Sequence, residues 1–92
     1  MKNKVDINDI QKGSTQAIAC AANVITESTI TYPVAFNTVP KVVASFYSDT
    51  KMVEYGKMTL MVFNVTETSF MVRIANASDK KLNPAVYWIA RK

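Results

Sequence analysis

The chain has 92 residues, 49% of them apolar, and its eleven basic and seven acidic residues give a formal charge of +4. This length suits one domain with a high ratio of surface to volume, which a partner subunit would help to stabilise. With no histidine, one cysteine and two glycines, the sequence excludes an intrachain disulfide, a Cys/His metal site and a glycine-rich phosphate loop. The usual general bases are also missing, so we expect a domain that is not an enzyme and needs no cofactor or metal.

Residues 1–12 are mixed and polar, and acidic residues interrupt the apolar ones. They carry neither the apolar region of a signal peptide nor a membrane span, so the chain is expected to be made in the cytoplasm without inserting into a membrane. We predict a tail or linker over 1–12 and a folded domain over 13–92 that begins at Gly13. The small residues of 14–22 favour extended structure, and Cys20, flanked by alanines, is expected to be buried.

The first clear strand is predicted over residues 28–34, where polar and apolar residues alternate. This period places Ile30, Tyr32 and Val34 on one face. Pro33 cannot donate a hydrogen bond to a neighbouring strand, so the strand should end there or lie at the edge of its sheet.

A further strand is predicted over residues 41–47, and a polar loop follows it from Ser48 to Gly56. Asp49 and Glu54 share this loop. Two carboxylates held several ångströms apart could serve a glycosidase. Acidic residues in loops are more often simply solvated, so catalysis is not expected from this pair.

The stretch 58–65 is apolar on both faces of the predicted strand. Leu60 and Val62 lie on one side, and Met61, Phe63 and Val65 lie on the other. A strand covered on both faces needs more cover than a small pair of sheets provides. The sequence leaves two interpretations open, a central core strand or an interface between subunits.

Two more strands complete the pattern. Residues 70–75 alternate, with Arg73 outward, and after a polar loop over 76–81 the chain closes with a strand over 85–90. The inward side chains of the first of these strands are Phe70, Val72 and Ile74. No window of eleven residues has a helical period, and turn signals recur about every ten residues. We therefore predict an all-β fold of six antiparallel strands in two sheets.

A nucleic-acid-binding barrel of the OB type is a rival interpretation, because aromatic rings near lysines can stack bases. The candidate rings are Tyr32, Tyr47, Tyr55, Tyr87 and Trp88. The lysines are spread along the chain as on an ordinary solvated surface, and the apolar strand around Trp88 favours core packing. The rival predicts a monomer whose binding falls steeply with salt. A nucleic-acid partner is not expected.

Several short segments, in this order and spacing, resemble the H-type lectin domain of snail agglutinins and discoidins, which also recurs in bacteriophage tail proteins. The resemblance spans about eighty residues. The matching segments are Ile10-Gln11-Lys12-Gly13, Ile30-Thr31-Tyr32-Pro33 with Phe36, Pro40-Lys41-Val42-Val43, Asn64-Val65-Thr66-Glu67-Thr68-Ser69-Phe70 and Trp88-Ile89-Ala90. The resemblance implies a six-stranded antiparallel β-sandwich that assembles as a homotrimer, with sugar bound in grooves between protomers.

The resemblance also implies a binding residue and two departures. The family's basic residue early in the fourth strand corresponds to Lys57, which can donate to sugar hydroxyls without the planar fork of arginine. In the loop before the last strand, where animal lectins carry an aromatic residue and a histidine, this chain has Asn76-Ala77-Ser78-Asp79. The N-acetylgalactosamine specificity of those lectins is therefore not transferred. The first long loop is shortened to about residues 23–27, as in the phage tail versions.

We therefore predict a receptor-binding tip domain of a phage or prophage tail protein, located in the virion and contacting a host cell-surface glycan. Hydroxyl hydrogen bonds and an apolar sugar face against a tyrosine would hold the glycan. The predicted carbohydrate-binding residues are Lys57, Asn76, Ser78, Asp79, Tyr55 and Tyr87. The alternative is a structural trimerisation module of a tail fibre that binds no sugar, which would explain the missing aromatic residue and histidine.

Overall fold

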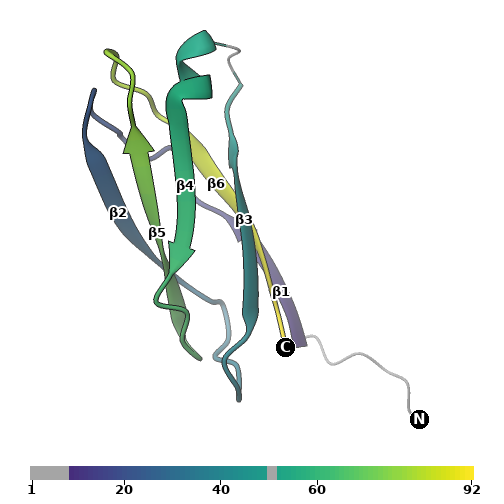
Figure 1. Ribbon diagram of the computed structural model, residues 1–92. Coiled ribbons are helices and arrows are strands. Elements are labelled where there is room, and N and C mark those ends of the chain that lie inside the picture. The colour runs from purple at the N-terminus through teal and green to yellow at the C-terminus, as the bar shows by residue number, and fades with distance from the viewer. Residues whose placement is uncertain (1–8, 50–51) are drawn as a thin grey trace.

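The computed structural model of the chain describes residues 9–49 and 52–92. Six strands form two three-stranded antiparallel sheets that lie face to face (Figure 1). One sheet has the order β1-β6-β3, from Ile10–Ser14, Ala85–Arg91 and Lys41–Tyr47. The other has the order β2-β5-β4, from Ile25–Thr31, Ser69–Asn76 and Met58–Phe63, and a short 3-10 helix, η2, covers Val53–Lys57. The predicted all-β sandwich of six antiparallel strands is confirmed.

The two central strands supply the middle of the core. Phe70, Val72 and Ile74 of β5 are fully buried, while Arg73 between them points to solvent, as the alternation predicts. The inward residues of β6 are Val86, Trp88 and Ala90. Full burial of one large apolar side chain is worth about 1.5–3 kcal/mol. The facing sides of β5 and β6 therefore hold the two sheets together.

The sheet begins earlier than the predicted domain start. β1 runs from Ile10 and pairs with β6, so the boundary predicted between residues 12 and 13 falls inside a strand, and the rest of the predicted tail, residues 1–8, lies outside the described residues. The inward side chain of β1 is the amide of Gln11, which donates to the Val34 carbonyl at 2.7 Å and accepts from the Val34 amide at 3.0 Å. A strand attached by hydrogen bonds rather than apolar burial leaves no hydrophobic period to read.

The effect of Pro33 is as predicted. β2 ends at Thr31, two residues before the proline, and it is an edge strand. Tyr32 is buried beyond the strand end, whereas Val34, expected on the same face, is exposed. β2 also starts at Ile25, so most of the short loop predicted over about 23–27 is strand, and Asn23 makes the turn before it with a positive φ of 58°.

β4 is an edge strand, so its interpretation as a central core strand is wrong. Leu60 and Val62 face the core, whereas Met61 and Phe63 lie on the outer face. The strand ends at Phe63, before Asn64 with its positive φ of 50°. The second apolar face of β4 is therefore not covered by the two sheets.

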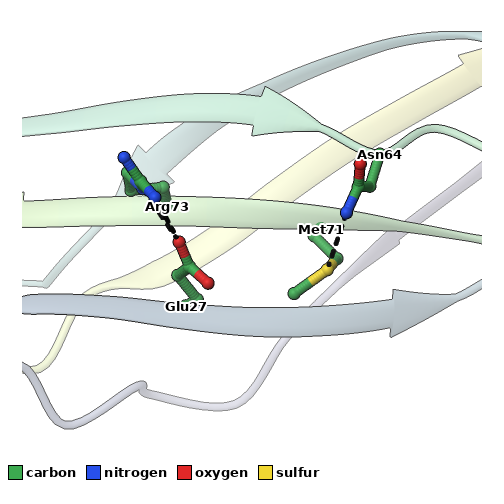
Figure 2. A network of polar contacts seen from close by, with 4 residues as sticks. All are labelled: Glu27, Asn64, Met71 and Arg73. Atoms are coloured by element: carbon green, nitrogen blue, oxygen red, sulfur yellow. Dashed lines mark hydrogen bonds and ion pairs between the residues drawn. The ribbon is translucent and has the colours of Figure 1, made fainter.

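Polar contacts cross this outer face (Figure 2). Arg73 pairs with Glu27 of β2 at 2.7 Å, and its guanidinium carbon lies 5.8 Å from the ring centre of Phe63 on the other side. Asn64 donates to the sulfur of Met71 at 3.6 Å. Since the ion pair is exposed, it adds at most about 1 kcal/mol. These contacts orient the side chains between β2, β5 and β4.

Four aromatic rings pack together at one end of the sandwich. Trp88 lies 5.5 Å from Phe70 and 5.9 Å from Tyr32, and Tyr32 meets Phe36 edge-on at 5.0 Å. Gly13 of β1 makes room for the indole, because a β-carbon there would come within 2.8 Å of the Trp88 Cζ2 atom. Core packing of Trp88 is confirmed, and the position of Gly13 admits no side chain without displacing that ring.

We expect Tyr32→Phe to leave the free energy of unfolding unchanged or to raise it by about 1 kcal/mol. The Tyr32 hydroxyl is buried without a hydrogen-bond partner among the described residues, and burial raises the pKa of this phenol. Removing an unpaired buried hydroxyl relieves its desolvation cost while the ring contacts remain. Urea unfolding followed by circular dichroism measures the change. A loss above about 1 kcal/mol would show that the hydroxyl has a partner.

Candidate functional site

Lys57 lies at the end of the sandwich where η2 meets β4. It is the last residue of η2, one position before the strand in which it was expected, and it is exposed. Its carbonyl accepts a hydrogen bond from the Ala77 amide at 3.1 Å. Lys57 is therefore attached to the loop between β5 and β6, where Asp79 is also exposed.

The base of this loop is the buried side chain of Asn76, which is only 2% exposed. Its amide nitrogen donates to three carbonyls, those of Cys20 at 3.0 Å, Ala21 at 3.2 Å and Lys80 at 2.9 Å. One side chain thus joins the end of β5 to two segments, the stretch before β2 and the return of its own loop.

The side-chain oxygen of Asn76 also forms hydrogen bonds. This Oδ1 atom accepts from the Ser78 amide at 3.0 Å and from the Ser78 hydroxyl at 2.7 Å. Ser78 is 0% exposed, and its hydroxyl also contacts the backbone of Lys80. Local bonds of this kind are what asparagine and serine form in turns. The polar groups of Asn76 and Ser78 are thus used within the loop of this protomer, and their contact with a sugar stays a prediction.

Tyr55 and Tyr87, the two tyrosines predicted to contact sugar, line a different region. They border one hollow of about 520 Å³ on the side of the β1-β6-β3 sheet. The Tyr55 hydroxyl accepts from the Asn83 amide at 3.4 Å. Tyr87 points outward from β6 and stacks on Tyr47 of β3, with ring centres 4.7 Å apart and planes 10° apart. The six predicted residues therefore lie in two places. Four are in or beside the loop between β5 and β6, two of them buried, and the two tyrosines border the hollow.

Tyr47 is a site residue that the sequence did not single out for sugar contact. Its hydroxyl donates to Asp49 Oδ1 at 2.5 Å, and this hydrogen bond and the charge of Asp49 raise the pKa of the phenol, with a smaller effect from Tyr87. Asp49 therefore holds a phenol instead of forming a carboxylate pair with Glu54 of η2. The pairing of β3 with β6 brings the two tyrosines together, which no local pattern reveals.

We expect Asp49→Asn to lower the pKa of Tyr47 towards that of an ordinary tyrosine. The carboxylate favours the protonated phenol, so in the native protein Tyr47 should ionise at a higher pH than an ordinary tyrosine. An absorbance titration of tyrosinate, compared between the two proteins, measures this shift. Comparison with Tyr47→Phe identifies which ionisation in the titration curve belongs to Tyr47. An unchanged titration in Asp49→Asn would contradict the contact.

Other chemistry has little support in the part of the chain that is described. Over 9–49 and 52–92 no three histidine, cysteine, aspartate or glutamate side chains cluster to hold a metal, and no helix there is long and apolar enough to cross a membrane. Cys20 is buried as predicted, and burial raises the pKa of its thiol. Tyr32 and Trp88 are core residues, so two of the five rings of the nucleic-acid interpretation are not available to bases.

Comparison with known proteins adds one family and one fold. A family model described as H-type lectin domain matches residues 27–90. No curated protein matches the chain. An N-truncated R1-type pyocin tail fibre has the same fold, with a TM-score of 0.74 and 17% identity over 88% of this chain and 67% of that chain. The C-terminal residues 323–701 of the P. aeruginosa R1 pyocin fibre match with a TM-score of 0.73 and 17% identity, over 88% of this chain and 22% of that chain.

Proposed function

The chain belongs to the H-type lectin domain family, and on this basis we propose that it is the carbohydrate-binding tip domain of a phage or prophage tail protein. It forms a homotrimer, and grooves between its protomers hold a glycan of the host cell surface. The observation that carries the proposal is the family match together with an exposed Lys57 beside a rigid loop. A lectin family supports a binding domain without catalysis.

The chemistry at the loop suits hydroxyl groups. The ammonium of Lys57 has three donors and the carboxylate of Asp79 has two acceptor oxygens, so the pair offers both kinds of partner that a sugar needs. Asn76 contributes indirectly, because its buried hydrogen bonds hold the loop in one conformation before a ligand arrives. Three weak sites on a rigid trimer facing a repetitive surface would gain avidity by orders of magnitude.

The outer face of the β2-β5-β4 sheet is the proposed contact between protomers. Met61 and Ile25 are about half exposed there, next to the ring of Phe63. Exposed apolar side chains gathered on one face are typical of an interaction surface. This assigns the second apolar face of β4 to the interface between subunits.

The location in a tail rests on the fold likeness. The two solved structures with this fold are pyocin tail fibres, of which the chain covers 67% and 22%. A tip domain needs only a small part of such a fibre. The proposed location is therefore the virion or a phage-like particle.

One observation favours a second candidate, a trimerisation module that binds no sugar. The loop that holds the sugar-binding aromatic residue and histidine in animal lectins here contains Asn76 and Ser78, and both are buried and fully hydrogen bonded. The same loop therefore has a structural role in this chain, whether or not Lys57 binds sugar.

A glycan array that includes bacterial cell-wall polysaccharides tests the proposal. We expect the native oligomer to bind and Lys57→Ala to reduce binding at least about tenfold, the loss of roughly 1.4 kcal/mol. Lys41→Ala, an exposed lysine at the far end of β3, is the matched control and should bind as the native protein does. Light scattering should give the mass of a trimer. A stable trimer that binds nothing supports the trimerisation module, and a monomer removes the groove between protomers.

A further inference from the structure

The outer face of the β1-β6-β3 sheet carries a continuous groove. A hollow of about 550 Å³ over the middle of the sheet and the hollow of about 520 Å³ near η2 share Ser14 and Tyr87. From Val43 at one end to Tyr47 near the other, the groove follows β3 for four residues, or about 13 Å. It then continues past the tyrosines to Asn83. This length exceeds that of a single sugar ring.

The groove has an aromatic and apolar floor. The stacked rings of Tyr47 and Tyr87 are 43% and 46% exposed, so part of each ring is open to a ligand. Val43 at 73% and Ile89 at 51% extend the apolar surface along the strands. A flat aromatic surface suits the apolar C–H face of a pyranose ring.

The rings are held in place before any ligand arrives. Asp49 accepts a hydrogen bond from the Tyr47 hydroxyl, and the backbone N–H of Asn83 donates one to the Tyr55 hydroxyl at the edge of the groove. Side chains that are already ordered lose little conformational freedom on binding. The groove is therefore preorganised along its length.

The polar groups beside this floor favour a neutral, hydroxyl-rich ligand. Asp49 supplies acceptor oxygens, Lys81 supplies donors, and Asn83 and Ser14 supply both. The lining holds two separated lysines, Lys12 and Lys81, and the acidic Asp49 next to the tyrosine stack. It therefore lacks the continuous positive charge that follows the backbone of a nucleic acid. Mixed donors and acceptors along an aromatic floor match a polysaccharide.

We propose that this groove is a second carbohydrate site, complete within one protomer, that binds an internal stretch of a linear, uncharged polysaccharide. The inference rests on the proposed function, but it assigns different residues: Lys57 and Asp79 do not line the groove, and no neighbouring copy is needed to complete it. On an array of linear polysaccharides, variants of the groove and the variant of Lys57 therefore report on the two sites separately.

The test compares the native protein with Tyr87→Ala, Tyr87→Phe, Val43→Lys and Lys57→Ala on the same array. A polysaccharide held in the groove should lose at least about tenfold in affinity with Tyr87→Ala, because this ring lines both hollows and its removal takes away much of the aromatic floor. Tenfold corresponds to about 1.4 kcal/mol. Tyr87→Phe keeps the ring and should bind within about threefold of the native protein, since threefold is under 1 kcal/mol. Val43→Lys blocks the far end of the groove at an exposed position and should also weaken binding.

Val39→Ala, at an exposed apolar residue before β3 that lines neither hollow, is the matched control and should bind normally. Melting temperature and oligomer mass should be unchanged in each variant that is scored. Competition by oligosaccharide fragments of the bound polymer, but not by its monosaccharides, supports binding of an internal stretch.

Binding that is lost with Lys57→Ala yet kept with both Tyr87→Ala and Val43→Lys would overturn the groove and leave the proposed function intact. Equal competition by monosaccharides would overturn the assignment to an internal stretch. Failure of the native oligomer to bind any polysaccharide would overturn the groove and the lectin function together.

Discussion

Trp88→Ala should lower the free energy of unfolding by about 3–5 kcal/mol, the cost of replacing a large buried aromatic side chain with alanine. The indole is 5% exposed and contacts the rings of Tyr32 and Phe70, so its removal leaves a cavity between the sheets. Domains of this kind have about 5–15 kcal/mol of stability in total. Because Trp88 is the only tryptophan, unfolding in urea is followed by far-ultraviolet circular dichroism instead of fluorescence.

Ile89→Ala is the matched control for this prediction, since Ile89 is the next residue of β6 and points to solvent. It should change stability by less than about 0.5 kcal/mol. Gly13→Ala adds a second check. The β-carbon that it introduces collides with the indole when Trp88 is present and has more room when it is combined with Trp88→Ala. The two substitutions should therefore cost less together than the sum of the single changes. Additive costs would mean that the glycine does not serve the indole.

Asn76→Ala should lower the free energy of unfolding by about 3–5 kcal/mol, although the side chain is small and polar. It leaves the Ala21 carbonyl without a donor and the Ser78 amide without an acceptor. It also takes one of two donors from the Cys20 and Lys80 carbonyls, which keep the Leu82 amide and the Ser78 hydroxyl. Each buried polar group left unpaired costs about 1–3 kcal/mol. Urea unfolding measures the loss, and Asp79→Ala in the exposed part of the same loop should change stability by less than about 0.5 kcal/mol.

Asn76→Asp makes the same contact sensitive to pH. Its carboxyl would face backbone carbonyls, so burial and these oxygens raise its pKa above about 3.9, the value in an unfolded chain. The folded state then holds the proton more tightly than the unfolded state, and stability is lost as pH rises through this range. We expect the variant to be more stable near pH 4 than near pH 7, relative to the native protein. The opposite dependence would show that the amide does not donate to those carbonyls.

The alternating strands were predictable from the sequence because burial repeats every second residue in them. Phe70, Val72 and Ile74 of β5 are apolar next to the outward Arg73, and this local period reflects a two-sided environment. Pro33 similarly marked an edge strand, because a missing donor is a property of the residue itself. Only local chemistry was needed in these cases.

The loop residues show where this reasoning fails. Asn76 and Ser78 are polar residues in a polar segment, which favours a solvated binding loop, yet both are buried. Their burial depends on carbonyls of Cys20 and Ala21, more than fifty positions earlier in the chain. A polar side chain gives no local sign of whether it will meet water, a sugar or a distant backbone group.

By itself, the sequence determined the all-β class, most of the inward-facing side chains and the resemblance to a lectin family, since each depends on residue type and spacing along the chain. Only the tertiary structure decided that β4 is an edge strand, that β1 begins at Ile10 and that Tyr47 stacks on Tyr87. These features depend on which strands pair and in which register. Strand order is set by contacts between residues far apart in the chain, whose combined free energy no single segment encodes.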